Sequence, residues 1–246
     1  MRPKIYLFGD SITEYSFAEG GWGAALTNHF SRRVDVVLRG FSGYNTRWAL
    51  KVIDKAFPPA SAAGSGGDEA EAEAPLAVTV FFGANDACLP DQYGAFQHVP
   101  VDEYKQNLRS IFSFFKRRWP KTHVVLITPP PIDEAARLLN PYGEIKLGLP
   151  ERTNEAAGSY AMACVSVASE CQTPAIDLWT KMQQIPGWQT AFLCDGLHLT
   201  ERGNRIVFEE VVAKFEEQGL RLETLPADFP LFTDIDPNDP LKAFET

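Results

Sequence analysis

Short hydrophobic runs alternate with longer amphipathic stretches along most of the chain. Runs of this length, separated by segments of helical period, are typical of strands in a sheet that is covered by helices. Five strands are predicted, over residues 4–8, 34–39, 77–82, 123–128 and 174–176.

The stretches between these runs place their hydrophobic residues at helical spacing. In the stretch 102–119, one face carries Tyr104, Leu108, Ile111, Phe112 and Phe115. Another stretch is preceded by an asparagine at position 45, which is placed to cap a helix. Helices are therefore predicted over residues 22–30, 46–56, 102–119, 151–170 and 200–219.

This alternation of strands and helices predicts an α/β fold with a parallel sheet and helices on both of its faces. Five strands joined by right-handed crossovers favour a flavodoxin-like, three-layer α/β/α sandwich. The 246 residues of the chain are enough to bury a sizeable core. We expect residues 1–219 to form one domain.

Two segments depart from the alternating pattern. Residues 58–75 are rich in Ala, Gly, Ser and acidic residues and have no hydrophobic period, so we expect a disordered acidic insertion loop. It should lie at the amino edge of the sheet, away from the ligand site, because it joins a helix to the following strand. The tail 220–246 contains Phe229, Leu231, Phe232 and Phe244, and we expect it to pack on the domain or on a dimer partner.

Composition and charge narrow the functional classes. The net charge is −9, which argues against a nucleic-acid-binding surface because such a surface needs a basic patch. No run approaches the roughly 18 apolar residues of a membrane span. The chain begins in a strand with no signal peptide, which favours the cytoplasm. The four cysteines show neither disulfide nor zinc-site spacing, so no metal is expected.

Four loops carry the candidate chemistry. Ligands of an open parallel sheet bind beyond the carboxyl ends of its strands. Glycine and small polar residues follow the first three predicted strands, at 9–13, 40–45 and 83–86. A fourth loop, Asp-Gly-Leu-His at 195–198, precedes the last predicted helix. All four loops are therefore expected at one edge of the sheet.

These loops contain the groups that acyl transfer requires. A serine hydroxyl becomes a good nucleophile when a base removes its proton, and a third group must orient the base. Ser11, His198 and Asp195 could fill these roles. The developing oxyanion needs hydrogen-bond donors. The backbone N–H groups of Ser11 and Gly43 and the side-chain amide of Asn85 could supply them.

Each motif taken alone also has a plainer interpretation. Gly-Asp-Ser is common in turns, Asn85 and Asp86 could form a turn pair, and His198 could cap or pack near a helix start. Cys194 could be a rival nucleophile, but nothing nearby would clearly activate it. The coincidence of four chemically suitable loops at one edge favours catalysis over these readings.

Four further residues flank the catalytic loops and are candidates for lining the substrate pocket. An equally open alternative is that they pack beneath it. They are Tyr44, Asn45, Leu197 and Leu199.

The four blocks resemble those of the SGNH hydrolases, also called the GDSL esterase/lipase family. That family is marked by blocks containing Ser, Gly, Asn and His, which match Ser11, Gly43, Asn85 and the Asp-x-x-His loop ending at His198. The resemblance runs from about residue 4 to residue 215. Ile12 stands where the family name implies leucine, which is a conservative change.

Within the family, the chain is most similar to the isoamyl acetate-hydrolysing esterase group and its plant relatives. The similarity rests on Phe-Gly-Asp-Ser-Ile-Thr at 8–13, Gly-Phe-Ser-Gly-Tyr-Asn-Thr-Arg at 40–47 and Asp-Gly-Leu-His-Leu-Thr at 195–200. The tail motifs within 225–237 also fit, whereas the acidic insertion departs from the group.

The resemblance implies a flavodoxin-like sandwich and a reaction that needs no cofactor. It implies Ser11 as nucleophile, His198 as base and Asp195 as the group that orients the base, with Ser11, Gly43 and Asn85 as oxyanion donors. It also implies small acyl esters, such as short-chain acetates, as substrates. Because many relatives form homodimers, it makes the tail a candidate dimer interface.

Other functions remain open alternatives. An acyltransferase or a carbohydrate deacetylase would use the same catalytic groups with a different acceptor or alcohol. A non-catalytic binding module could share the fold, although the intact Ser, Asp and His set argues against it. A phosphate-handling doubly wound protein would carry a G-x-x-x-x-G-K-[ST] loop, and an α/β-hydrolase would carry a G-x-S-x-G elbow. The sequence contains neither motif, which disfavours both of these protein classes.

Overall fold

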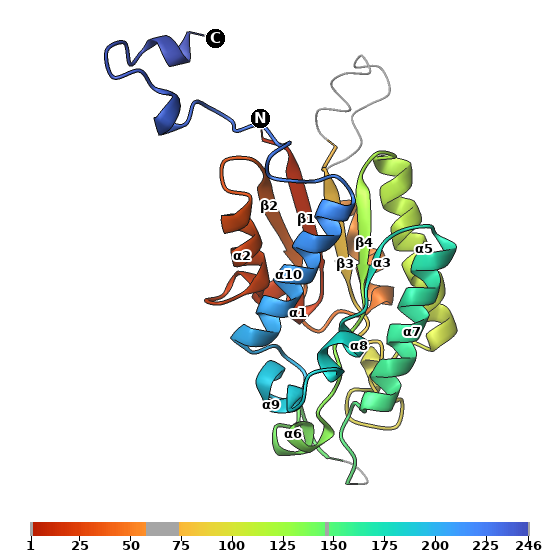
Figure 1. The fold of residues 1–246 in the computed structure, drawn as a ribbon. Coiled ribbons are helices and arrows are strands. Elements are labelled where there is room, and N and C mark those ends of the chain that lie inside the picture. The colour runs from red at the N-terminus through yellow and green to blue at the C-terminus, as the bar shows by residue number, and fades with distance from the viewer. Residues whose placement is uncertain (1, 58–73, 146–147, 246) are drawn as a thin grey trace.

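The computed structural model describes residues 2–57, 74–145 and 148–245. Its centre is a parallel five-stranded sheet with the order β2-β1-β3-β4-β5. The strands are β1 (Lys4–Gly9), β2 (Asp35–Gly40), β3 (Ala77–Phe81), β4 (His123–Ile127) and β5 (Ala175–Ile176). Helices cover both faces (Figure 1), so the predicted flavodoxin-like sandwich is confirmed.

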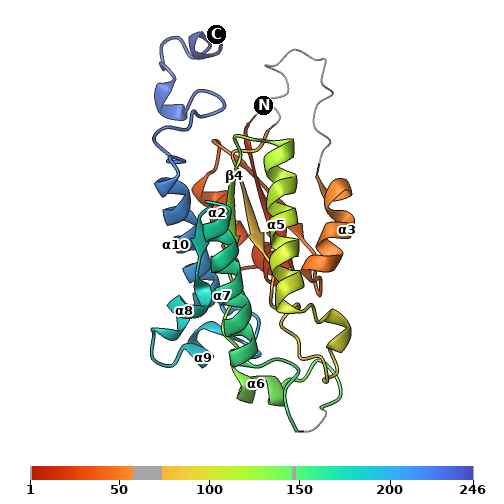
Figure 2. The same cartoon turned by 90° about the vertical axis from the view of Figure 1, so that its right-hand side faces the viewer.

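Hydrophobic side chains alternate between the two faces of the sheet and form a core on each side. Ile5 and Leu7 of β1 belong to one core, which is covered by α2 (Trp22–His29) and α10 (Glu201–Glu217). Tyr6 and Phe8 belong to the other core. The helices over that second core are α3 (Thr46–Ala56), α5 (Val101–Arg118) and α7 (Asn154–Glu170), as Figure 2 shows from the side.

The second core is built mainly from aromatic rings. Phe8 is fully buried and lies edge-on to Phe57, Phe82 and Phe115, with ring centroids 5.2, 4.8 and 6.1 Å away. Edge-to-face contacts of this kind add to the free energy gained from burial. This cluster joins β1 to α3 and α5 and fixes the strand whose end carries Ser11.

The helix predicted over residues 151–170 begins three residues later than expected. Thr153 caps α7, because its hydroxyl accepts a hydrogen bond from the N–H of Ala156 at 3.2 Å. Glu151 and Arg152 precede the cap and are buried. Their side chains form an ion pair inside the protein. The sequence pattern predicts instead that these two residues belong to the first turn of the helix.

Within residues 2–57, 74–145 and 148–245, four short α-helices were not anticipated, since each is too short to show a hydrophobic period. All four lie at or near the carboxyl edge of the sheet (Figure 1). They are α1 (Ser11–Glu14), α6 (Glu134–Leu139), α8 (Leu178–Gln183) and α9 (Trp188–Phe192).

Most of the predicted insertion, residues 58–73, lies outside the described residues. The chain is described again from Ala74 and joins the sheet at its amino edge. There the N–H of Leu76 donates to the carbonyl oxygen of Lys4 at 2.8 Å.

The first part of the tail lies against the domain. Leu220 and Leu225 are buried at its edge, and Asp228 forms ion pairs with Arg2 and Arg32. Beyond Leu231 the tail extends away from the sheet (Figure 1), with Phe232 88% exposed. That this segment packs on the domain or on a dimer partner stays a prediction.

None of the helices in the described part of the chain is both long enough and apolar enough to cross a membrane.

Truncating the central ring of the aromatic cluster should destabilise the fold strongly. Phe8→Ala is expected to lower the free energy of unfolding by about 3–5 kcal/mol, because it removes buried contacts and leaves a cavity. Urea unfolding measures this change. The matched control is Phe232→Ala, whose ring is exposed and whose loss should stay within about 0.5 kcal/mol. Equal effects of the two variants would contradict the packing described.

Candidate active site

Ser11 is held at the carboxyl end of β1 by a tight strand-to-helix turn. It is the first residue of α1, and the Asp10 carboxylate caps that helix by accepting a hydrogen bond from the N–H of Ile12 at 3.0 Å. Helix α1 passes so close to β2 that a Cβ atom on Gly40 would lie 2.1 Å from the backbone nitrogen of Glu14. Glycine at position 40 therefore allows α1, and with it Ser11, to sit directly on the sheet edge.

The loop at 195–198 brings an acid and a base to Ser11. The Ser11 hydroxyl lies 3.0 Å from Nε2 of His198, and Nδ1 of His198 lies 2.8 Å from Oδ2 of Asp195. The other oxygen of Asp195 accepts from the backbone N–H groups of His198 and Leu197, at 2.7 and 3.0 Å. The Asp195 carboxylate therefore contacts both the ring and the backbone of His198, and so fixes the orientation of the ring.

The Asp195 carboxyl is ionised over the whole pH range in which His198 can act as a base. Burial alone would raise the pKa of the Asp195 carboxyl, but the hydrogen bonds from the ring and backbone of His198 outweigh it and hold that pKa well below its usual range. An ionised acceptor fixes the proton of His198 on Nδ1. Nε2 is then free to accept the Ser11 hydroxyl proton.

Gly43 and Asn85 lie beside Ser11 in the same pocket. Gly43 has φ of +77°, a left-handed conformation that favours glycine. The amide oxygen of Asn85 accepts from Arg152 and Gln97, at 2.9 and 3.2 Å. Its amide nitrogen donates one N–H to the carbonyl oxygen of Tyr44 at 2.9 Å. The second N–H of that amide remains for a ligand in the pocket.

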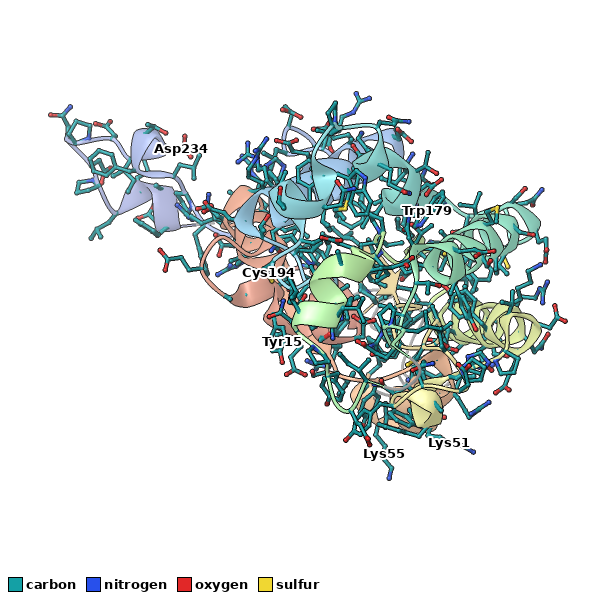
Figure 3. All side chains as sticks on the ribbon, turned by 90° about the horizontal axis from the view of Figure 1, so that it is seen from below. Tyr15, Lys51, Lys55, Trp179, Cys194 and Asp234 are labelled. Atoms are coloured by element: carbon teal, nitrogen blue, oxygen red, sulfur yellow. The ribbon has the colours of Figure 1, made fainter. Side chains whose placement is uncertain are left out.

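The pocket around these groups has a volume of about 250 Å³, and most of the side chains that line it carry polar groups. Its walls come from all four predicted loops and from the chain around α6. Figure 3 shows this end of the molecule, with Tyr15 and Cys194 next to α6. Besides the residues already placed, the lining includes Tyr15, Ser42, Arg137, Asn140, Pro141 and Tyr142.

The four predicted pocket residues take different places. Leu197 lines the pocket, and Leu199 lines an adjoining cavity of about 200 Å³ that also reaches His198. Asn45 is fully buried and caps α3 through the N–H of Trp48 at 2.9 Å. The ring of Tyr44 stacks on a neighbouring aromatic ring at 5.3 Å and is not among the lining side chains.

Sequence reasoning missed three buried charged residues at the inner wall of the pocket and behind it. Arg137 contacts Asp195, Arg152 contacts Asn85, and Glu151 contacts both arginines. No local pattern marks them, because a charged residue at a helical position is most often on the solvated face.

Cys194 is not activated to compete with Ser11 as nucleophile. Burial raises the pKa of its thiol, and the nearby charge of Asp195 raises it further. Because the thiolate is the reactive form, both effects make the thiol less nucleophilic at neutral pH.

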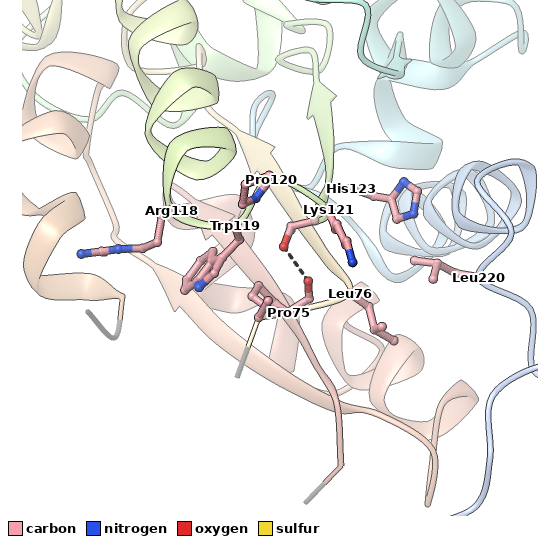
Figure 4. A pocket seen from close by; sticks show the side chains of 10 residues that line it. Pro75, Leu76, Arg118, Trp119, Pro120, Lys121, His123 and Leu220 are labelled. Atoms are coloured by element: carbon pink, nitrogen blue, oxygen red, sulfur yellow. Dashed lines mark hydrogen bonds between the residues drawn. The ribbon is translucent and has the colours of Figure 1, made fainter. Parts of the chain in front are cut away.

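A larger apolar cavity lies at the opposite, amino edge of the sheet and has a volume of about 360 Å³. Figure 4 shows its walls, which include Pro75, Trp119 and Leu220. Among the described residues that line it, none is a serine, cysteine or carboxylate. The larger volume of this cavity is therefore no evidence that catalysis takes place there. Similarly, no group of three or more His, Cys, Asp or Glu side chains in the described ranges could hold a metal ion.

The similarity to known proteins extends over the whole domain. The family described as GDSL-like lipase/acylhydrolase matches residues 5–211. A GDSL esterase/lipase from Arabidopsis thaliana is 63% identical over 100% of this chain and 99% of its own. An isoamyl acetate-hydrolyzing esterase 1 homolog from Bos taurus is 43% identical, over 95% of this chain and 88% of its own.

Solved structures share the fold at lower identity. A lipase/acylhydrolase from Enterococcus faecalis superposes with a TM-score of 0.65 at 24% identity, covering 94% of this chain and 100% of that one. An acetylxylan esterase from Geobacillus stearothermophilus gives 0.63 at 20% identity, covering 89% and 95%.

Two buried carboxyls near the site should make stability depend on pH. Burial raises the pKa of Asp10 and of Asp86 to about 7 each, whereas an unfolded aspartate titrates near roughly pH 4. Between these values the folded protein binds more protons than the unfolded chain, so the free energy of unfolding should fall as the pH rises. Carboxyls with lowered pKa, such as Asp195, titrate below this window.

Urea unfolding at pH values from about 5.5 to 8 measures this dependence, and Asp86→Asn should flatten it. Asp91→Asn is the control, because Asp91 is exposed. A slope that is unchanged in Asp86→Asn would contradict the predicted titration.

Proposed function

This chain belongs to the GDSL-like lipase/acylhydrolase family and is a carboxylic ester hydrolase, and on that basis we propose that it cleaves small short-chain acyl esters through an acyl-enzyme on Ser11. The observation that carries the proposal is the hydrogen-bonded chain from Ser11 through His198 to Asp195. It opens into a pocket that also contains Gly43 and Asn85.

The first half of the proposed reaction forms the acyl-enzyme. As the oxygen of Ser11 attacks the ester carbonyl carbon, its proton passes to Nε2 of His198. The ionised Asp195 stabilises the imidazolium that results. The carbonyl oxygen becomes an oxyanion, which the backbone N–H groups of Ser11 and Gly43 and the amide of Asn85 stabilise.

The second half releases the acyl group. It begins once the first tetrahedral intermediate has collapsed, which expels the alcohol with the proton from His198 and leaves the acyl group on Ser11. Water then enters, gives a proton to Nε2 of the same histidine and attacks the acyl carbonyl. Collapse of the second intermediate frees the carboxylic acid and returns the proton to Ser11.

The size of the pocket supports a small substrate. Its volume of about 250 Å³ is below the roughly 300–1,000 Å³ of sites that hold drug-sized ligands. The names of similar proteins agree, since one relative is a homolog of an isoamyl acetate-hydrolyzing esterase.

The polar walls favour a second candidate, a carbohydrate deacetylase. Ser42, Asn140 and Tyr142 would meet a hydroxyl-rich alcohol better than an aliphatic one. A solved structure with the same fold is described as an acetylxylan esterase. Acetate release from an acetylated xylooligosaccharide, compared with release from isoamyl acetate, separates the two candidates.

Ser11→Ala should abolish ester hydrolysis and leave the fold intact, because alanine has no nucleophilic oxygen. The measurement is hydrolysis of p-nitrophenyl esters from acetate to palmitate by wild type and variant. Wild-type turnover should be fastest on the short chains. Circular dichroism checks the fold, and a variant that keeps wild-type turnover would exclude Ser11 as nucleophile.

Asn85→Ala should reduce kcat by about two orders of magnitude, which is the usual loss for one oxyanion donor. KM should change little, since the donor acts mainly on the transition state. Steady-state kinetics on p-nitrophenyl acetate measure both constants. If kcat stays within a factor of about two, Asn85 is a turn residue and not an oxyanion donor.

A further inference from the structure

A buried group of charges lies at the inner wall of the active-site pocket and behind it. The side chains of Arg137, Glu151 and Arg152 are 3%, 6% and 4% exposed. Arg137 lies on α6, whereas Glu151 and Arg152 lie in the segment that leads into α7. Buried charges are costly unless each is paired and hydrogen-bonded. Stability alone therefore does not explain why these three charged side chains are buried together.

Glu151 is the centre of this group. One of its carboxylate oxygens accepts three N–H donors, two from Arg137 at 2.6 and 2.9 Å and one from Arg152 at 3.0 Å. Its backbone carbonyl accepts from the N–H of Leu89 at 2.9 Å, which ties it to the loop that carries Asn85. The position of Glu151 is thus fixed from both its main chain and its side chain.

Arg137 carries the effect of Glu151 to the catalytic base. Its guanidinium donates to the backbone carbonyl oxygen of Asp195 at 3.0 Å and to Oδ2 of the same residue at 3.1 Å. That Oδ2 is also the atom that accepts the hydrogen bond from His198. The orientation and charge of the acid and base therefore depend on where Arg137 is held.

Arg152 carries the effect of Glu151 to the oxyanion side. It donates to the backbone carbonyl oxygen of Ala84 at 2.8 Å, to Oδ1 of Asn85 at 2.9 Å and to Oε1 of Gln97 at 3.0 Å. The amide nitrogen of Gln97 donates in turn to the carbonyl oxygen of Gly43 at 2.9 Å. Arg152 thereby fixes which end of the Asn85 amide faces the pocket.

We propose that Glu151 is a positioning residue that couples the catalytic base to the oxyanion donors, through Arg137 on one side and Arg152 on the other. The inference rests on the proposed function of the site. The two arginines, Glu151 and Asp195 together carry no net charge, so the site has one compensated set of charges. Without the Glu151 carboxylate, two buried guanidinium groups would face each other with only Asp195 to neutralise them.

Loss of that carboxylate should affect kcat and leave KM nearly unchanged, because the groups it positions act mainly on the transition state. It should also add positive charge near His198. A more positive surrounding disfavours imidazolium, so the acid limb of kcat/KM should move to lower pH. Arg137→Met removes positive charge from the same region and should move that limb the opposite way.

The direction of these shifts depends on every charged or titratable group that faces His198. They come from its own loop, from α6, from the end of β1, from the segment after α1 and from the start of α10. These groups are Asp195, Cys194, Arg137, Asp10, Tyr15, Glu19 and Glu201.

The test compares Glu151→Gln with Glu170→Gln in the full chain. The control makes the same chemical change at the surface ion pair between Arg109 and Glu170, which joins α5 to α7. Steady-state kinetics on p-nitrophenyl acetate give kcat and KM across the pH range. NMR titration of the His198 ring, assigned with His198→Gln, reports the base without requiring turnover. Thermal unfolding confirms that each variant is folded.

We expect Glu151→Gln to lose about tenfold to a hundredfold in kcat, because small displacements of catalytic groups have effects of that size. Its KM should stay within about twofold of wild type, and its His198 titration should move to lower pH. In Glu151→Gln combined with Asn85→Ala, the loss should be smaller than the product of the two single losses, since both act partly through the same amide.

The outcomes separate this inference from the proposed function. A folded Glu151→Gln protein with the kcat and His198 titration of the Glu170→Gln control would overturn the inference. Multiplicative losses in the double variant would also overturn the coupling. If Glu151→Gln does not fold, Arg152→Lys and Arg137→Met are measured in the same way, and wild-type kinetics in both would overturn it. Wild-type hydrolysis that persists in Ser11→Ala would instead overturn the proposed function, while the His198 titration would still decide whether Glu151 acts on the base.

Discussion

Four hydrogen bonds converge on the carboxylate of Asp195, and the geometry of the site depends on them. They come from the ring and backbone of His198, from the backbone of Leu197 and from Arg137. The bonds from His198 and Leu197 keep the acid ionised despite its partial burial. An ionised Asp195 fixes the tautomer of His198, and the tautomer decides whether Nε2 can accept the proton of Ser11. The base, the nucleophile and the charge balance behind them therefore follow from one carboxylate.

The parallel sheet brings these groups to one place. Strands β1, β2 and β3 run side by side in register, so the loops that carry Ser11, Gly43 and Asn85 open at the same edge. Gly40 allows α1 to lie directly on that edge. The two hydrophobic cores hold the strands from both faces. Packing of fully buried residues such as Phe8, next to the last residue of β1, therefore determines the precision with which a polar site is held.

The buried charged residues at the inner wall of the pocket show how a polar site can be supported from inside the protein. Arg137 and Arg152 come from different segments, and both meet the same oxygen of Glu151. Burial makes such an arrangement sensitive, because the removal of any member leaves an uncompensated charge in a region of low dielectric constant. The same sensitivity would make the group an effective means of fixing the catalytic side chains relative to each other.

The sequence by itself determined the class of fold, because hydrophobic periodicity records which residues face a core, and each predicted strand matches an observed one to within about two residues. It also indicated Ser11, Gly43, Asn85, Asp195 and His198, because the chemistry of these side chains is local to short loops, and the structure places them around one pocket. It missed α1, α6, α8 and α9, which are too short to show a period.

Only the tertiary structure decided the surroundings of the site. Asn45 and Tyr44 flank a catalytic loop in sequence, yet one caps α3 and the other packs on aromatic rings. Arg137 and Glu151 are 14 residues apart and meet only because α6 and the segment before α7 fold back on each other. Whether a charged side chain faces water or a buried partner depends on contacts between distant segments, and neither periodicity nor a local motif records such contacts.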